Sequence, residues 1–243
     1  MKRVVVILLV LILLGLVGLG IFFIISNNKP VVEKPTPPPI VEIKEPAEEI
    51  VVNSVTTKVE TKKRFIDVNM PAFEELTNFS FQESINKEIA ELINPYINEI
   101  KIVSDDSISK QYKYYVDFER YDNDIFVSLV IDQNYVTGGM RSNAWKDTFT
   151  IDIIENKKVM LADICSSEDY KKIIVDEVNK QAKQKEINLV AGNGLVDIPD
   201  TQRFYIKDEK LYIYFEPASI APYLDGEMHF EMPFEYEDGK FKM

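Results

Sequence analysis

The sequence has very little of the chemistry on which many enzymes depend. It contains one cysteine, Cys165, and one histidine, His229, among 243 residues. Because a serine or cysteine nucleophile needs a histidine beside it, only His229 could activate one. The sequence also lacks a P-loop, a Rossmann glycine pattern and an HExxH motif. These absences favour a non-catalytic protein, and we expect neither a cofactor nor a metal.

The single cysteine also limits how the fold can be stabilised. One cysteine cannot form an internal disulfide, so an exported domain with this sequence has to be held together by packing. Hydrophobic residues make up 46% of the chain, including 14 Phe and 12 Tyr, which can fill a sizeable core. Cys165 follows the largely apolar stretch 161–164. We expect it to be a buried small hydrophobe and not a nucleophile.

His229 falls in a predicted strand, residues 227–236, where side chains alternate between two faces. His229 then shares a face with Glu227, Glu231 and Glu235, which predicts a solvated polar surface. Two alternatives stay open: a general acid or base, and a metal site formed by Glu227, His229 and Glu231. Neighbours on one face lie about 6.5 Å apart, so a metal would need ligands from elsewhere. A pair of carboxylates could also serve a glycosidase, but the sequence does not select one pair among 40 acidic residues.

Basic residues are scarce, with 28 Lys and Arg against 40 Asp and Glu. No basic patch with interleaved aromatic residues occurs, which argues against binding to nucleic acid. Without Lys2 and Arg3, 26 basic side chains stand against 40 acidic ones, a net charge of −14. Such a surface would steer cationic partners, although solubility alone explains it equally well.

Long hydrophobic runs are absent except at the N-terminus, where Val4–Ile25 contains no charge and no proline. At about 1.5 Å per residue this stretch reaches about 33 Å, enough to cross the hydrocarbon core of a bilayer. Lys2 and Arg3 precede it, so residues 1–3 form a cytoplasmic tail and the rest lies outside. A cleaved signal peptide is the alternative, but no Ala-x-Ala site follows. We expect a single-pass protein of the cell membrane with residues 4–25 as its anchor.

A proline-rich linker follows the predicted anchor and spans residues 26–50. Its prolines alternate with charged and β-branched residues, a composition that favours the polyproline II conformation at about 3.1 Å per residue. Its proline-rich part, residues 29–50, can therefore hold a folded domain up to about 65 Å from the bilayer.

Hydrophobic periodicity in the remaining chain predicts an α+β fold. It consists of a mainly antiparallel sheet with two main helices packed beside it, preceded by the transmembrane helix. We assign residues 51–106 to an N-terminal α/β module and residues 107–243 to a C-terminal α+β domain. A proline is expected to end the strand at residue 71, and another to kink or split the first helix at residue 95. The predicted strands are 51–61, 64–71, 112–119, 125–131, 145–154, 201–206, 211–215 and 227–236, and the predicted helices are 81–103 and 166–185.

Several stretches resemble a known family. Residues 204–217, which read FYIKDEKLYIYFEP, and residues 220–223 with Gly226 resemble the end of a domain of unknown function. That domain is shared by the extracytoplasmic part of the anti-sigma factor RsiV and the N-terminal part of the peptidoglycan deacetylase PdaC. Residues 135–139, YVTGG, match the family's aromatic-x-x-Gly-Gly turn, and residues 64–71 and 84–86 resemble a smaller module that precedes it. The similarity covers roughly residues 55–237.

The departures from this family restrict what the resemblance implies. Met140-Arg141-Ser142 stands where the family commonly has Ala-His-Gly. The chain also has no cytoplasmic anti-sigma segment and no deacetylase domain, so neither of those activities is implied. The resemblance implies the fold, an extracytoplasmic location and binding to an extracellular protein, because RsiV-like domains bind lysozyme, which is cationic.

Together these features predict a membrane-anchored, extracytoplasmic binding or sensing domain of the bacterial cell envelope. The expected partners are the membrane, through the N-terminal helix, and a basic extracellular protein such as lysozyme or a cell-wall component, with no nucleic acid. The alternatives are a cell-wall hydrolase or deacetylase, an accessory subunit of one, or a structural envelope protein. For residues 217–223, a rigid turn packed on the sheet is the alternative to binding. The predicted ligand-binding residues lie in two loops and are Tyr135, Gly138, Gly139, Arg141, Pro217, Pro222 and Tyr223.

Overall fold

The computed structural model describes residues 50–138, 142–189, 194–222 and 227–243. Ala47–Met243 form one compact unit. The predicted anchor and almost all of the linker, residues 1–49, lie outside the described residues. Within the described part of the chain, no helix is both long enough and apolar enough to cross a membrane.

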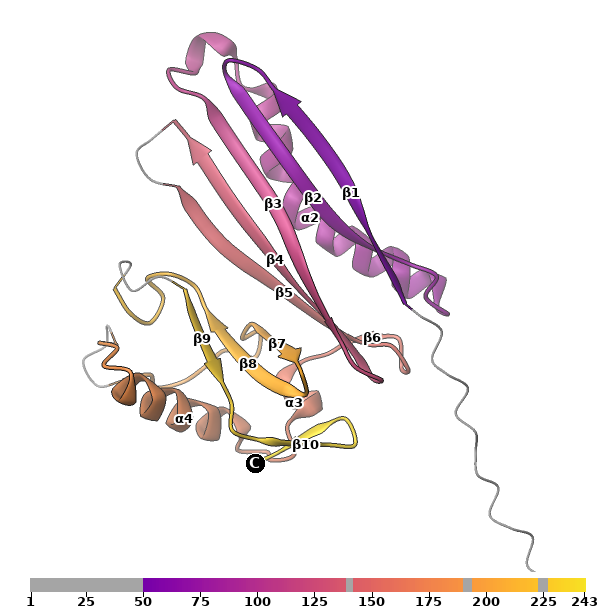
Figure 1. Ribbon diagram of the computed structural model, residues 1–243, viewed down its shortest axis with the longest axis vertical. Coiled ribbons are helices and arrows are strands. Elements are labelled where there is room, and N and C mark those ends of the chain that lie inside the picture. Colours follow the sequence, from indigo (N-terminus) through magenta and orange to yellow (C-terminus); the bar gives the residue numbers. More distant parts are fainter. Residues whose placement is uncertain (1–49, 139–141, 190–193, 223–226) are drawn as a thin grey trace, which may run out of the picture. The chain divides into compact units, whose positions relative to one another are not determined.

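A six-stranded sheet runs in the order β1-β2-β3-β4-β5-β6 (Figure 1). Its neighbouring strands are antiparallel except for β2 and β3, which are parallel. A parallel pair needs a long crossover, and α2 (Phe79–Ile102) supplies it. The α+β fold is confirmed, while the parallel pair was not predicted. The strands are β1 (Val51–Glu60), β2 (Arg64–Glu74), β3 (Tyr112–Asp122), β4 (Phe126–Thr137), β5 (Asn143–Asp152) and β6 (Lys157–Lys158), and a 3₁₀ turn, η1 (Asp105–Ser107), precedes β3.

The first core lies between this sheet and α2. Asn78 begins the helix, with its side chain accepting a hydrogen bond from Phe81 N at 3.0 Å. A row of isoleucines from Ile85 to Ile100 then faces the sheet. Pro95 does not split the helix, because it lies on the exposed face, where water can reach the carbonyl that proline leaves unpaired. The sheet side of this core includes Ile66, Val68, Tyr114, Val116, Leu129, Ile131, Phe149 and Ile151.

The prediction that β2 ends at Pro71 was wrong, because the strand continues to Glu74. Pro71 lies opposite Ser54 of β1. On its other side, pairing with β3 has already stopped at Val68. The missing N–H of Pro71 therefore breaks no bond of the sheet when it points to that unpaired side.

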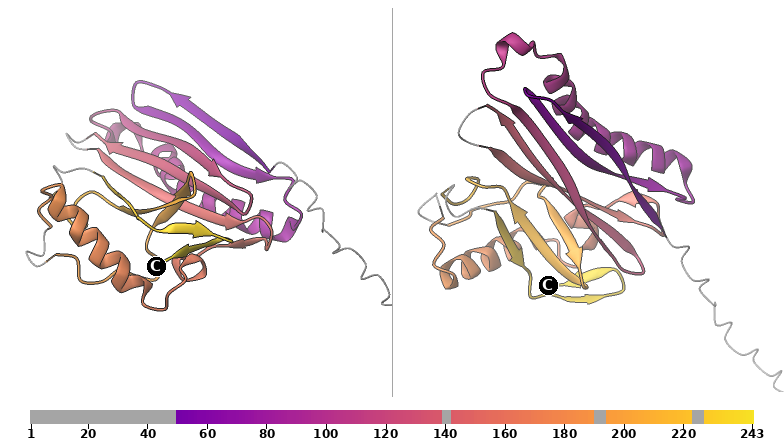
Figure 2. Two further views of the ribbon diagram at one scale, coloured as in Figure 1. Left: turned by 60° about the horizontal axis from the view of Figure 1, so that its bottom comes forward. Right: turned by 45° about the horizontal axis from the view of Figure 1, so that its top comes forward.

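A second core forms around α4 (Tyr170–Gln184) and a three-stranded sheet in the order β7-β8-β9 (Figure 2). The helix begins later than predicted, with Asp169 rather than Ser166 as its N-cap residue. Its buried side chains are Ile174, Val175, Val178 and Ala182. The other elements are α3 (Leu161–Ile164), β7 (Phe204–Lys207), β8 (Lys210–Phe215), β9 (Met228–Glu231), β10 (Glu235–Glu237) and β11 (Lys240–Lys242).

The last predicted strand, residues 227–236, is two strands in the structure. β9 ends at Glu231 and β10 begins at Glu235, where it pairs with β11 instead of β8. Met232 N still donates to Leu211 O at 2.8 Å, and Pro233 follows it in the segment between β9 and β10.

Hydrogen bonds join the two sheets directly. Ile206 N of β7 donates to Ser128 Oγ of β4 at 3.0 Å. Lys146 N of β5 donates to Tyr214 Oη of β8 at 3.1 Å. Strands from both sides of residue 106 also share the six-stranded sheet, so the sheet that carries the candidate site is built from both predicted segments.

Candidate ligand-binding site

Strand pairing gathers polar side chains on the sheet face opposite α2. Asp67 lies beside Tyr115, which lies opposite Asn134. One step along the strands, Asp117 lies opposite Asp132. Directly paired residues, and residues two apart on one strand, point to the same face. The even-numbered neighbours on β2 and β3, such as Ile66 and Tyr114, point the other way into the core.

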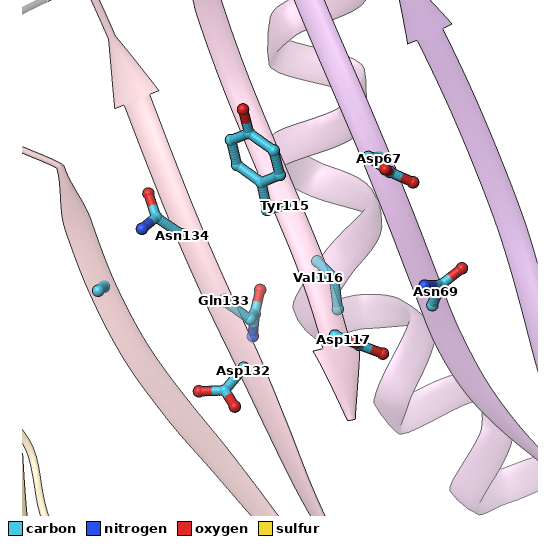
Figure 3. A pocket seen from close by; sticks show the side chains of 9 residues that line it. Asp67, Asn69, Tyr115, Val116, Asp117, Asp132, Gln133 and Asn134 are labelled. Atoms are coloured by element: carbon cyan, nitrogen blue, oxygen red, sulfur yellow. The ribbon is translucent and has the colours of Figure 1, made fainter. Parts of the chain in front are cut away.

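These side chains line a pocket of about 360 Å³, which we call the acidic pocket (Figure 3). Figure 3 shows α2 behind the sheet and the labelled side chains arising from β2, β3 and β4. This volume is at the small end of ligand pockets, which run from about 300 to 1,000 Å³. It is lined by Asp67, Asn69, Tyr115, Val116, Asp117, Asp132, Gln133, Asn134 and Ala144.

The three carboxylates of the acidic pocket are not equivalent. Asp67 Oδ1 pairs with Lys58 Nζ at 3.2 Å, and Asp132 pairs with Lys146 Nζ. Asp117 is exposed, and its side chain accepts a hydrogen bond from the backbone of Phe118 at 2.9 Å. Among the described residues it has no ion-pair partner. Two like charges facing each other across strands repel, so the Asp117–Asp132 pair costs stability.

Tyr115 gives the pocket an aromatic surface. Its side chain is among the large hydrophobic ones that stay exposed, at 38%. The ring is supported from one side by Phe65, with ring centroids 5.0 Å apart and tilted by 34°. A half-exposed tyrosine beside carboxylates can hold a cation over its face or stack against a flat apolar group.

A polar chain leads from the acidic pocket to the only histidine. Lys146, which pairs with Asp132, also lies 3.4 Å from Glu227 Oε2. Glu227 lies 3.5 Å from His229 Nε2, and His229 Nδ1 lies 3.2 Å from Tyr205 Oη. Lys146 is largely buried, with a side-chain exposure of 13%. The chain of contacts therefore couples the charge of Asp132 to the β8–β9 edge.

The expectation that His229 lies on a solvated face holds in part: Glu227, Glu231 and Glu235 are exposed, but the His229 side chain is only 30% exposed. The His229 ring packs against Tyr205 and Tyr214 at centroid distances of 5.8 and 5.1 Å, because these tyrosines lie in the same three-stranded sheet and Tyr214 is directly opposite His229. Burial lowers the pKa of His229, although the neighbouring Glu227 acts in the opposite direction. Glu231 is instead held by Lys210 and Tyr212. In the described ranges, no group of three His, Cys, Asp or Glu side chains is placed to hold a metal ion.

The residues predicted for ligand binding lie in different surroundings. Tyr135 is 6% exposed and packs against Tyr96 in the α2 core, and burial followed by the Glu99 carboxylate raises its pKa. Gly138 follows the last residue of β4 with φ +78°, close to Lys110. Pro217 is half-buried and Pro222 is exposed, both after β8. Gly139, Arg141 and Tyr223 lie outside the described residues.

Sequence reasoning missed the acidic pocket itself. Its signal was present, because Asp67, Tyr115, Asp117 and Asp132 all occupy polar positions of alternating strands. The pairing that brings them together could not be deduced from the alternation alone.

One family model matches a segment in the second half of the chain. Residues 162–235 match the model of a family described as "Protein of unknown function (DUF3298)". This segment contains α4 and β7–β9, and it begins after the last residue of the acidic pocket. A comparison with curated proteins finds no match.

Two solved structures resemble the chain over most of its length. A DUF3298 family member from Bacteroides fragilis NCTC 9343 is 16% identical, with a TM-score of 0.56, over 78% of this chain and 92% of that one. A DUF3298 family protein from Pseudomonas aeruginosa PAO1 is 11% identical, with a TM-score of 0.56, over 78% of this chain and 93% of that one. At these identities the likeness shows the fold. The relation to RsiV and PdaC stays a prediction.

Proposed function

We propose that the chain is a membrane-tethered, extracytoplasmic binding domain whose acidic pocket takes a cationic side chain of an extracellular protein. The observation that carries this proposal is the exposed Asp117 carboxylate, which faces Asp132 and has no cation paired with it among the described residues. A lysine or arginine from a partner would relieve the repulsion between the two carboxylates. It would also gain charge-assisted hydrogen bonds and the face of Tyr115.

The surrounding charge supports the same kind of partner. The whole chain carries a formal charge of −12, and a field of that sign accelerates the approach of basic proteins. Lysozyme, a basic protein that reaches the envelope, is a suitable probe.

Catalysis has less support. Burial raises the pKa of the Cys165 thiol to about 12, so Cys165 is a poor nucleophile at neutral pH. Burial also lowers the pKa of His229. His229 is partnered by Tyr205 and Glu227. A binding role needs only the exposed side chains of the acidic pocket, such as Asp117 and Tyr115, and requires no nucleophile.

The experiment that tests the binding role is the salt dependence of association. The full chain in a nonionic detergent is titrated with lysozyme, and the dissociation constant is measured from low to physiological ionic strength. We expect binding that weakens steadily with salt, because the attraction between exposed charges is screened. Absence of binding at low salt would refute the proposal for this class of partner.

A cell-wall sugar is a second candidate, because Tyr115 is flanked by the side-chain amides of Asn69 and Asn134 in the same pocket. A tyrosine ring offers an apolar face to a sugar ring, and amides hydrogen-bond hydroxyl groups. Titration with neutral peptidoglycan fragments distinguishes the two candidates, because sugar binding would change little with salt.

The location is proposed from the sequence. Val4–Ile25 would hold the chain in the membrane, and residues 26–50 would space the domain from it. Protease added to intact cells should then digest residues 51–243, and a domain that stays intact while a known surface protein is cut would contradict this location.

A further inference from the structure

The strand β1 lies at the end of the six-stranded sheet and is bonded on one side only. All ten of its residues, Val51–Glu60, pair with β2. No other described strand pairs with its outer edge (Figures 1 and 2). Residues 53–56 are exposed, and Val55 is 47% exposed. Its outer N–H and C=O groups are therefore open to another strand.

Soluble proteins usually protect such an edge, but β1 has little protection. It contains no proline, no glycine and no bulge in its register with β2. Its only charged residues are Lys58 and Glu60, and six of the other eight residues are valine or threonine. The opposite end of the sheet, β6, is short, with two residues. Short strands, prolines and repeated lysines are the usual means of preventing edge pairing.

The hairpin between β1 and β2 fixes which residues point outward. Thr61 N donates to Arg64 O at 2.8 Å at the hairpin end. In an antiparallel pair the bonded and non-bonded positions alternate. The odd-numbered residues of β1 therefore bond to β2, and the backbone groups of its even-numbered residues point away from the sheet.

We propose that β1 pairs antiparallel with β1 of a second copy about a twofold axis that passes through Val55. Only residues of the same parity can face each other, because the outward groups of both copies must meet. In this register Val55 faces Val55 of the second copy, and Val51 faces Val59. The valines meet at positions that do not exchange hydrogen bonds across the new pair, where facing side chains come closest. The pairing is symmetric, as a twofold dimer requires.

The distribution of charged residues around β1 favours an antiparallel arrangement of two copies. In the sequence, Glu48 and Glu49 precede Ile50 and β1, and the turn after β1 carries Lys62 and Lys63. The two copies of an antiparallel pair run in opposite sequence order, so the acidic end of one chain corresponds to the basic end of the other. Within β1 itself no charged residue faces another, because Lys58 lies opposite Val52 in this register. A parallel arrangement would place like charges together.

The dimer is compatible with two tethered chains. The two copies of Val51 would be separated by eight positions along the strands, about 27 Å. A linker of the length proposed here spans this distance. The dimer does not rest on the proposed ligand, because it uses the outer edge of β1 and not the acidic pocket.

Disulfide trapping tests the register. Val55→Cys is introduced into the full chain in a nonionic detergent, mild oxidant is added, and covalent dimer is measured on a nonreducing gel. The native chain is the background control, because Cys165 is buried. Thr57→Cys is the matched control, since its two copies would be about 13 Å apart, beyond the reach of a disulfide.

A mixture of two variants sharpens this test. Asn53→Cys and Thr57→Cys face each other in the proposed register, so a mixture of the two tagged chains should give a covalent dimer of unlike chains, while each alone should not. We expect at least a tenfold excess of dimer for Val55→Cys over Thr57→Cys. Equal yields, or trapping through Thr56→Cys in place of Val55→Cys, would overturn the proposal.

A proline variant tests the edge without a new covalent bond. The backbone of Thr56 points outward, so Thr56→Pro removes a backbone bond of the dimer and no backbone bond to β2, although it also removes the exposed side-chain bond from Thr56 Oγ1 to Asn69 Oδ1. Sedimentation should give a dissociation constant at least tenfold higher for this variant, with cooperative unfolding retained. A native chain that stays monomeric throughout the micromolar range would also overturn the proposal.

Discussion

Arg203 and Asp147 form an ion pair that ties the segment before β7 to strand β5, with Nη2 2.6 Å from Oδ1. The Asp147 side chain is almost completely buried. Its other oxygen, Oδ2, accepts hydrogen bonds from Gln133 Nε2 at 2.6 Å and from Trp145 Nε1 at 3.1 Å. A buried carboxylate needs such compensation, so this pair helps to fix the second core against the first sheet.

Replacing Arg203 with Met should destabilise the domain by about 2–3 kcal/mol, because the Asp147 charge would stay buried with no cation. The loss is smaller than for a fully buried pair, since the Arg203 side chain is 31% exposed. Urea unfolding measures the change. Glu216→Gln is the control, because it removes the more exposed partner of Arg203 and should cost less than about 1 kcal/mol. Equal losses would show that Asp147 is not the partner that matters.

Asp117→Asn should stabilise the domain by about 0.5 kcal/mol, because it removes a like charge directly opposite Asp132. The asparagine oxygen can still accept the bond from Phe118 N. Denaturant unfolding at low salt measures the gain, which should shrink as salt is added. A loss of stability would mean that the native carboxylate is already compensated, which is contrary to its proposed role in binding.

His229 makes stability depend on pH in a defined direction. Its pKa is lowered in the folded domain, chiefly by burial against Tyr205 and Tyr214, with Lys146 acting in the same sense and Glu227 and Asp132 opposing. Below about pH 6.5 the unfolded chain takes up a proton before the folded domain does. The contribution of His229 is therefore fully present above this pH and is lost as the pH falls through the lowered folded value.

The measurement is the free energy of unfolding between about pH 7.5 and 5 for the native chain and the His229→Gln variant. The difference between the two should change with pH, and the native chain should lose more stability on acidification. Parallel curves would show that the histidine titrates alike in both states.

Cys165 should react slowly with thiol reagents in the folded domain. Burial raises the pKa of its thiol to about 12, so little thiolate exists near pH 8. Labelling is followed by the absorbance of the chromophore that the thiol reagent releases. It should be slow in the folded domain and fast in denaturant. Rapid labelling of the folded domain would place the thiol at the surface.

Hydrophobic periodicity predicted most helices and strands, because each of them buries the side chains of one face. The isoleucines of α2 and the alternating residues of β3–β5 illustrate this. The parallel pairing of β2 with β3 was not predicted, since it joins strands separated by a helix. Pro233 could have indicated the break after β9. The burial of Asp147 could also have been predicted, because Asp147 shares one face of the strand with the hydrophobic residues Trp145, Phe149 and Ile151.

The acidic pocket required a register that the sequence did not provide. A turn centred on residues 121–124 would pair Asp117 with Ser128. The actual turn lies farther along the chain and pairs Asp117 with Asp132. A shift in a hairpin moves every cross-strand pair, so the like-charge pair becomes visible only when the turn is placed correctly.

The most direct test of the binding role compares two variants of equal charge. Asp117→Asn with Asp132→Asn removes two charges from the acidic pocket, while Glu83→Gln with Asp106→Asn removes two exposed charges on and after α2. Titration with lysozyme at low salt should show at least about tenfold weaker binding for the pocket variant, because contacts in the site contribute beyond the net charge. The α2 variant should bind within about twofold of the native chain, since distant charges act only through the screened field. Equal weakening in both variants would contradict a cation site in the acidic pocket.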